Sequence, residues 1–295
     1  MDVSVIIVNY KTVPLILDCL ESLRTKTKGI TYEVIVVDNN SGDDFQERIL
    51  ERFPEVQCLP LPENVGFGRA NNEGLKIAKG RNIFFLNPDT LLLNNAIKIL
   101  SDYLDGHPQV GACGGNLYDA EMNPAHSYQM YLPSLFWEIN IFLYGFPEKV
   151  VWGRNAQFNH TDSPLKVGFV TGADMMVPYR VLKLTGSFSS KFFMYYEDPE
   201  LCFRIRKNGF DVVSVPAAEI MHLEQKSFKA DEINTRRLLI FETSYSLYHS
   251  LHTPLFQRRL IQILRMCRLY SKRLLRGKAA FPDNLFKKRK EIIKM

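Results

Sequence analysis

Short apolar runs alternate with amphipathic segments along the first part of the chain. The runs have the length of strands and lie at residues 3–8, 32–37, 56–59, 83–86 and 110–113. Between them lie segments with the 3.6-residue spacing typical of helices, at 12–23, 43–52, 67–78 and 92–104. This alternation predicts an α/β fold with a Rossmann-like, mostly parallel central sheet and helices on both faces.

The run at 83–86 has no polar interruption and is followed by Asn87-Pro88-Asp89. A continuous apolar strand is typical of a parallel sheet that is buried on both faces. Pro88 lacks a backbone donor and favours an extended conformation at Asn87, so we expect the strand to end there. Because ligands bind beyond the carboxyl ends of such strands, Asp89 is predicted to lie in a functional site.

Two further acidic positions follow predicted elements, namely Asp38 and the pair Glu197-Asp198. Each candidate also has a structural interpretation. Asp38 can form an Asx turn in the polar loop that follows it. Asp89 can cap the helix predicted at 92–104, and Asp198 can cap a helix that has Pro199 in its first turn. The residues alone leave these interpretations open.

Beyond residue 115 the pattern is less regular. Residues 116–165 show little periodicity, and we interpret them as a variable insertion over the site. Further strands are predicted at 167–177, 212–215 and 220–222, and helices at 180–184, 199–208, 231–252 and 256–276. The chain is thus predicted to hold a catalytic domain at 1–225 and a C-terminal helical extension at 226–295.

The composition is that of a globular protein, with 46% apolar and 23% charged residues, but the charge is unevenly distributed. Residues 255–295 hold 13 Lys and Arg against Asp283 and Glu291, a net charge of +11. The total of +5 therefore leaves −6 for the remainder. A tail of this kind predicts an anionic partner.

The segment 256–276 has an apolar side and a basic side when it is drawn as a helix. Such a helix binds an anionic membrane surface, or it packs on the catalytic domain with its basic side in solvent. No nucleic-acid motif is present, so we expect no nucleic-acid partner. Both membrane binding and packing stay open at this point.

Location is predicted from what the chain does not contain. It has no run of about 18 apolar residues and no basic segment before the first apolar run, so we expect neither a membrane span nor a signal peptide. The five cysteines are scattered and odd in number, which argues against a disulfide framework. We therefore expect a cytoplasmic protein, peripheral on the inner face of the cell membrane.

Five motifs in order carry a resemblance to a known family. They lie at residues 5–10, 36–41, 64–72, 86–90 and 195–204. Together they resemble the inverting glycosyltransferases of family 2, which have the GT-A fold. The Asn-Pro-Asp at 87–89 and the Glu-Asp at 197–198 are most similar to the bacterial rhamnosyltransferases. The resemblance covers roughly residues 1–225, and it makes 116–165 an acceptor-side insertion.

The resemblance implies roles for individual residues. Nucleotide binding is implied for Asn9, Tyr10, Asp38, Asn40, Asn64, Gly66, Arg69, Asn71 and Asn87. Contact with the donor sugar is implied for Gly172, Ala173 and Asp174.

Metal and catalytic roles are implied in the same way. Asp89 and His222 would hold Mg²⁺ or Mn²⁺ on the donor diphosphate, although Asn87 stands where the family's first metal-binding acid is expected. Asp198 would be the base that takes the proton of the acceptor hydroxyl, with Glu197 beside it.

The function implied is transfer of a sugar, rhamnose from dTDP-rhamnose, to a saccharide or lipid-linked acceptor in envelope or capsular polysaccharide synthesis. Two alternatives were weighed. A nucleotidyltransferase would need a glycine-rich basic loop after the first strand, and residues 9–13 hold no glycine. A non-catalytic nucleotide-sugar-binding protein would leave the carboxylates after three predicted elements unexplained.

Overall fold

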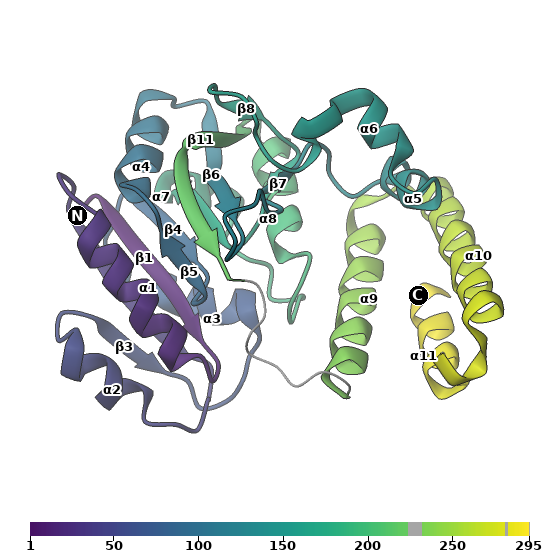
Figure 1. The fold of residues 1–295 in the computed structure, drawn as a ribbon, viewed down its shortest axis with the longest axis horizontal. Coiled ribbons are helices and arrows are strands. Elements are labelled where there is room, and N and C mark those ends of the chain that lie inside the picture. The colour runs from purple at the N-terminus through teal and green to yellow at the C-terminus, as the bar shows by residue number, and fades with distance from the viewer. Residues whose placement is uncertain (224–231, 281–282, 295) are drawn as a thin grey trace.

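The computed structural model describes residues 1–223, 232–280 and 283–294, and its centre is a twisted mixed sheet (Figure 1). The strand order is β3-β2-β1-β4-β10-β6-β11-β5, with β8 paired to β11. The strands are β1 (Val3–Asn9), β2 (Tyr32–Asp38), β3 (Gln57–Pro60), β4 (Asn82–Leu86), β5 (Thr90–Leu92), β6 (Val110–Tyr118), β8 (Leu165–Lys166), β10 (Asp174–Pro178) and β11 (Asp211–His222). Neighbours are parallel from β3 to β4 and between β6 and β11, whereas β10 and β5 run antiparallel to theirs. The prediction of a mostly parallel sheet is confirmed.

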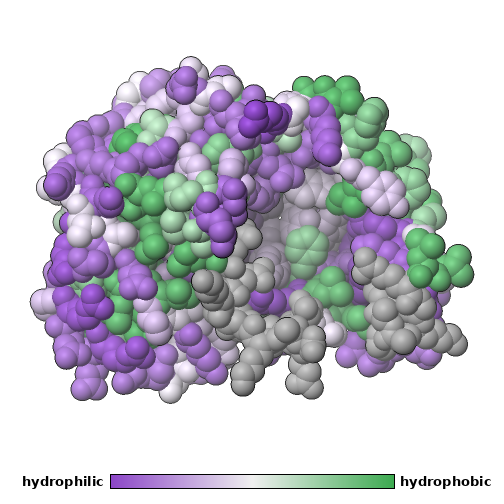
Figure 2. Space-filling view, in the orientation of Figure 1, coloured by the Kyte–Doolittle hydropathy of each residue, from purple (hydrophilic) through white to green (hydrophobic). Residues whose placement is uncertain are grey.

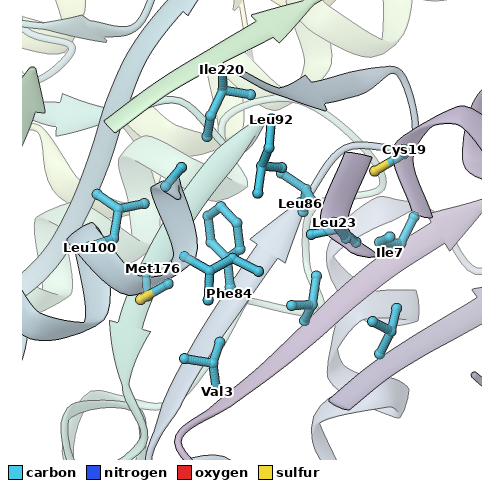
Figure 3. Close-up of a cluster of buried hydrophobic side chains, with 14 of the residues drawn as sticks. Val3, Ile7, Cys19, Leu23, Phe84, Leu86, Leu92, Leu100, Met176 and Ile220 are labelled. Carbon is cyan, nitrogen blue, oxygen red and sulfur yellow. The ribbon is translucent and has the colours of Figure 1, made fainter. Parts of the chain in front are cut away.

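Helices cover both faces of this sheet, as predicted. One face carries α1 (Val13–Lys26), α2 (Phe45–Arg52) and α4 (Ala96–Gly106), and the other carries α3 (Phe67–Leu75), α7 (Tyr179–Thr185) and α8 (Glu197–Lys207). Successive side chains of a strand point to opposite faces. Phe84 and Leu86 therefore pack under α1 and α4 (Figure 3). Ile83 and Phe85 pack under the other layer. This double burial explains the uninterrupted apolar run of β4.

The segment after β4 differs from the prediction. The helix expected from Leu92 begins at Ala96, because residues 90–92 form β5 instead. Thr90 and Leu92 pair with His222 and Ile220 at the end of β11. The interpretation of Asp89 as a helix cap is therefore wrong. In the same way, the two short strands predicted at 212–215 and 220–222 are one strand, β11, with an irregularity between Ser214 and Glu219.

The region predicted as an irregular insertion contains defined structure. Strand β7 (Tyr128–Gln129) pairs with β9 (Phe169–Val170), and α5 (Leu135–Phe142) and α6 (Phe146–Trp152) follow β7, with a short 3-10 turn (Gly153–Ala156). The buried Glu148 carboxylate accepts hydrogen bonds from Gln129 Nε2, Tyr131 Oη and Asn140 Nδ2 at 2.5–3.0 Å. Buried polar contacts, rather than apolar periodicity, order this region.

Three helices complete the chain: α9 (Glu232–His252), α10 (Leu255–Ala280) and α11 (Asp283–Lys294). The predicted domain boundary at 225/226 lies outside the described residues. Helix α10 carries two of its arginines inward, since Arg265 donates to Glu242 and Ser246 and Arg268 lies 3.5 Å from Glu138. The expectation of a basic side turned to solvent is therefore wrong at these two positions. Across the described ranges, no helix combines the length and apolar character that crossing a membrane would require.

Candidate active site

Asp38, at the end of β2, is held by a network of polar side chains. Asn9 Nδ2 donates to Asp38 Oδ1 at 2.7 Å, and Ser41 Oγ donates to the same oxygen at 2.5 Å. The Ser41 amide donates to Asp38 Oδ2 at 3.1 Å, so Asp38 does close the loop that follows it, although through the amide three residues on and not the one two residues on that an Asx turn uses. This fixes the Asp38 carboxylate at the sheet edge. Asn9 itself is fully buried and positions Asp38 instead of facing a ligand.

The glycine-rich loop at 64–72 is tied to this edge by Asn39, a residue to which the sequence analysis gave no role. Asn39 Nδ2 donates to Asn64 Oδ1 at 3.0 Å, and Asn39 Oδ1 accepts from the Val65 amide at 2.9 Å. Asn64 Oδ1 also accepts from the Gly66 amide at 3.0 Å. The loop is thereby preorganised next to Asp38, before helix α3 begins at Phe67.

Gly66 lies where no side chain fits. Its φ is +90°, and an added Cβ would come within 2.2 Å of the Phe193 carbonyl oxygen. Gly42 offers a matched control, because its φ is +72° and an added Cβ would meet nothing within 4 Å. Both alanine variants carry a backbone cost of about 1 kcal/mol or more for positive φ, and the cost is larger at Gly66, whose ψ of 171° places it in a region essentially restricted to glycine.

We predict that Gly66→Ala lowers the free energy of unfolding by about 2 kcal/mol more than Gly42→Ala does, since the loop or the Phe193 segment must move. Urea unfolding of the two variants measures this difference. Equal destabilisation would contradict the predicted clash between the loop and Phe193.

Asp89 and His222 meet beyond the end of β4, although 133 residues separate them in sequence. His222 Nε2 lies 3.3 Å from Asp89 Oδ1 and 3.3 Å from Asn87 Nδ2. The side chain of Asp89 is 17% exposed and that of His222 14%, so both remain accessible. The pairing of β5 with β11 produces this contact. It places the two residues predicted as metal ligands together.

The donor atoms at this place fit a divalent cation that is shared with a substrate. Mg²⁺ is commonly held by one or two carboxylates while substrate phosphates and water complete its shell, and imidazole suits Mn²⁺ less than oxygen does. Among residues 1–223, 232–280 and 283–294, no three His, Cys, Asp or Glu side chains gather into a complete protein site. Asp89, with His222, can hold a cation whose remaining ligands are substrate phosphate oxygens or water.

Asp198 and Glu197 follow an unusual turn at residues 195–196, which sets their position. Tyr195 and Tyr196 are consecutive non-glycine residues with φ of +68° and +66°, a strained conformation that is typical of functional sites. Helix α8 begins at Glu197, so Asp198 lies inside its first turn and does not cap it. The Asp198 carboxylate accepts instead from the Gly172 amide at 3.0 Å. The interpretation of Asp198 as a helix cap is therefore wrong.

The two carboxyl groups have altered acidity. Burial raises the pKa of Glu197, and the neighbouring charge of Asp198 raises it further. Glu197 Oε2 is buried without a hydrogen-bond partner, which fits a carboxyl kept neutral. Burial also raises the pKa of Asp198, although the Gly172 amide opposes the shift. The pair can therefore hold one proton and offer one carboxylate, the arrangement that a general base needs.

The C-terminal helices support the turn that carries this pair. The Tyr196 ring packs edge-on against Tyr245 of α9 at 5.3 Å and also contacts Tyr248 at 5.8 Å. Ser244 Oγ donates to the Met194 carbonyl at 2.8 Å. Ile261 of α10 joins the same buried cluster. The strained turn is thus held in place by α9 and α10, two helices that come later in the sequence.

Residues 172–174 connect the two acidic places. The Ala173 carbonyl accepts from the Asn87 amide at 2.9 Å, and the Gly172 amide holds Asp198. Asp174 is fully buried: Oδ2 accepts from the Gly115 amide at 2.6 Å and Oδ1 has no partner. Burial raises the pKa of Asp174 to about 7, while the Gly115 amide and His222 oppose the shift. Asp174 therefore lies under the site and not at its surface.

The remaining residues predicted for nucleotide binding are placed differently from one another. Asn71 is buried and donates to the Phe67 carbonyl at 3.1 Å. Arg69 is exposed and donates to the Ser190 carbonyl at 2.7 Å. Tyr10 is partly exposed, and Asn40, with φ of +59°, is exposed beside the Asp38 turn. Asn40 and Tyr10 are thus available to a ligand, whereas Asn71 lies inside α3 and bonds to the first residue of its own helix.

Comparison with known proteins supports an enzyme assignment. Residues 4–163 match the model of glycosyl transferase family 2. A curated N-acetylglucosaminyl-diphospho-decaprenol L-rhamnosyltransferase of Mycobacterium tuberculosis is 27% identical over 77% of this chain and 78% of its own length. The hexosyltransferase Agl10 of Haloferax volcanii, named for low-salt glycan biosynthesis, is 24% identical over 84% of this chain and 72% of its own length.

Solved structures show the same fold. A crystal structure of GalNAc-T7 with UDP, GalNAc and Mn²⁺ aligns with a TM-score of 0.63 and 12% identity, covering 99% of this chain and 54% of the other. Staphylococcus aureus TarS 1–349 with UDP-GlcNAc aligns with a TM-score of 0.57 and 18% identity, covering 90% and 70%. The fold is therefore the GT-A fold, as the resemblance implied. With the family model matching more than half of its residues, the chain belongs to glycosyl transferase family 2.

Proposed function

We propose that this glycosyltransferase moves rhamnose from dTDP-rhamnose, with inversion, to a lipid-linked saccharide acceptor in envelope polysaccharide synthesis. The observation that carries the proposal is the convergence of the Asp89–His222 pair and the Asp198 carboxylate on the segment 172–174. The named activity of the mycobacterial relative supports the choice of sugar and of a lipid-linked acceptor. At 27% identity this support is for a class of substrate, which an experiment must test.

The proposed reaction uses the chain's own groups in order. Asp38 accepts a hydrogen bond from the donor base, and the preorganised loop around Gly66 receives the nucleoside. The acceptor hydroxyl attacks the anomeric carbon, and its proton passes to Asp198. The bond from the anomeric carbon to the diphosphate breaks, and the electron pair leaves with the nucleoside diphosphate. A divalent cation bound through Asp89 and His222 would neutralise charge on that diphosphate.

The acceptor side is proposed to include a cavity of about 880 Å³ between the segment 188–196 and the C-terminal helices. Its wall combines apolar residues such as Phe193 and Leu247 with the cations Lys191, Arg236 and Lys288. Phe193 also contacts the glycine-rich loop through its carbonyl, which accepts from the Phe67 amide at 2.9 Å. An amphiphilic anion such as a lipid diphosphate matches this lining.

Donor identity is tested by thermal shift with a panel of nucleotide sugars and Mn²⁺. We expect dTDP-rhamnose to raise the melting temperature more than UDP-GlcNAc or GDP-mannose, because a ligand that binds only the folded state stabilises it by mass action. Chromatographic detection of the released nucleoside diphosphate and the glycosylated product then checks turnover. A larger shift and turnover with another nucleotide sugar would replace the proposed donor. No shift with any donor would contradict nucleotide-sugar binding.

A further inference from the structure

Helix α10 is amphipathic, yet two cations of its charged side, Arg265 and Arg268, face the protein. Arg265 is only 4% exposed, and its guanidinium lies 4.1 Å from the centre of the Tyr245 ring. Glu242 forms ion pairs with Arg265 of α10 and Arg289 of α11, and Glu138 of α5 forms an ion pair with Arg268 of α10. These buried acids fix the rotation of the helix, because turning it outward would take Arg265 from Glu242 and Arg268 from Glu138, and would leave Glu242 with Arg289 and Glu138 with the Tyr245 hydroxyl.

The opposite side of α10 is apolar and faces solvent. A stripe at helical spacing consists of Phe256, Ile263, Tyr270, Leu274 and Leu275, which are 74%, 57%, 47%, 86% and 81% exposed. A soluble surface helix normally shows the reverse arrangement, with its apolar stripe in the core. An exposed stripe of this size marks a surface that another phase or molecule covers.

The stripe continues onto α5 and α6, since α5 packs directly against α10. Side chains exposed on this hairpin are Ile139, Ile141, Phe142, Leu143, Tyr144, Phe146, Val150 and Val151. Figure 2 shows apolar side chains gathered over α5, α6 and α10, while much of the remaining visible surface is polar. We call the stripe and these hairpin residues together the apolar shelf.

The charges around the apolar shelf have one sign. The acids of α5 and α6, Glu138 and Glu148, are buried at 1% and 7% exposure, and α10 contains no acid. Lys149 of α6, Arg154 of the 3-10 turn after α6 and Arg259 of α10 are exposed. The exposed Asp283 of α11, near the end of α10, is paired with Arg273. An apolar surface whose own helices carry exposed cations and no exposed acid is complementary to anionic lipid headgroups over acyl chains.

We infer that the apolar shelf docks the enzyme on an anionic lipid bilayer, with the α5–α6 hairpin and the outer side of α10 inserted at the interface. A second copy fits less well, because a two-fold contact would set this face against itself, so that its exposed cations would meet other cations and no exposed acid of these helices. The docking surface is thus the apolar side of the tail helix, not its arginine side. This inference rests on the proposed function, because docking on a bilayer would bring the enzyme to its lipid-linked acceptor.

The test is vesicle flotation of the full chain with two lipid compositions at 0.1 M salt. We expect strong partition onto vesicles of equal parts phosphatidylcholine and phosphatidylglycerol, and at least about tenfold weaker partition onto pure phosphatidylcholine. The double variant Leu274→Ser, Leu275→Ser should partition at least about tenfold more weakly than the wild type. Leu184→Ser on α7, an exposed leucine at 63% outside the apolar shelf, is the matched control and should partition like the wild type.

Further measurements separate the outcomes. Lys149→Glu with Arg259→Glu should weaken binding to the anionic vesicles only. Equal partition of the wild type and the Leu274/Leu275 variant would overturn the inference. A wild type that is dimeric in sedimentation velocity, with the same variant monomeric, would also overturn the inference, because the apolar shelf would then be covered by a second copy. Transfer to a water-soluble acceptor analogue is measured in parallel. A wild type that transfers sugar but does not bind anionic vesicles refutes only the docking surface, and a wild type that binds vesicles but transfers no sugar refutes only the proposed function.

Discussion

Replacing Asp198 with Asn is expected to lower kcat for sugar transfer by about 1,000-fold, within the range that general-base catalysis contributes. The amide keeps the shape of the carboxylate but cannot take the acceptor proton. Donor affinity should change little, because Asp198 is held by the Gly172 amide and not by the residues around Asp38 or Asp89. Steady-state transfer assays together with calorimetric titration of the donor measure the two effects separately.

Glu197→Gln and Asp102→Asn are the comparisons for this variant. Asp102 is an exposed carboxylate on α4 paired with Lys98, so its loss should leave transfer unchanged. Glu197→Gln mimics the neutral carboxyl that burial favours and should cost less than Asp198→Asn. Near-normal turnover of Asp198→Asn, combined with a large loss in Glu197→Gln, would move the role of base to Glu197.

The pH dependence of kcat gives a second readout of the same prediction. A base acts as a carboxylate, so a raised pKa means that activity is lost as pH falls through that raised value, above the ordinary aspartate value of about 3.9. The wild type should therefore lose kcat at mildly acidic pH, where unperturbed carboxylates remain ionised. A pH profile that is flat down to about pH 4 would contradict the raised pKa.

Replacing Asp89 with Asn is expected to weaken Mn²⁺-dependent donor binding by at least about 100-fold, more than the loss typical of a residue that only orients a metal ligand. The reason is that the two side chains beside Asp89 bring no negative charge. Asn87 is a neutral amide, and His222 is neutral when it binds a metal. Asp89 is thus the one carboxylate in that group. Titration of the donor with Mn²⁺ and with a chelator gives the metal-dependent part.

His222→Gln provides the graded comparison for Asp89→Asn. It removes an imidazole but no charge, so its effect should be in the same direction and smaller. Nucleoside binding in the chelator should be the same in all three proteins, because Asp38 and the loop around Gly66 are untouched. Wild-type donor affinity of Asp89→Asn in the presence of Mn²⁺ would exclude Asp89 as a metal ligand.

The fold could be predicted where the pattern along the chain reports burial directly. Continuous apolar runs such as 83–86 identified strands buried on both faces, and Pro88 identified where β4 ends. What failed depends on contacts between distant residues. Nothing at 90–92 indicates a strand until Ile220 and His222 pair with it. In the 116–165 region order comes from a buried Glu148 that periodicity does not reveal.

The orientation of the tail helix was unpredictable for a related reason. A helical wheel shows that α10 has two sides but not which side faces inward. That choice is made by Glu242 and Glu138, which lie on other helices. The site shows the same division. Asp38 and Asp89 were found because they follow predicted strands. The strand end expected before Glu197-Asp198 is absent between α7 and α8, and Asn39 acts through contacts with a loop 25 residues later. No signal in the sequence predicts left-handed tyrosines at 195 and 196.

The packing of Tyr196 against Tyr245 and Tyr248 limits how this enzyme can be recombined with its relatives. The family match ends at residue 163, before the turn at 195–196, so a chimaera designed on that match alone would treat the later helices as interchangeable. A crossover between α8 and α9 would place a foreign helix against the native turn and shift Asp198. Residues 188–265 should therefore be exchanged, and are expected to have been inherited, as one block.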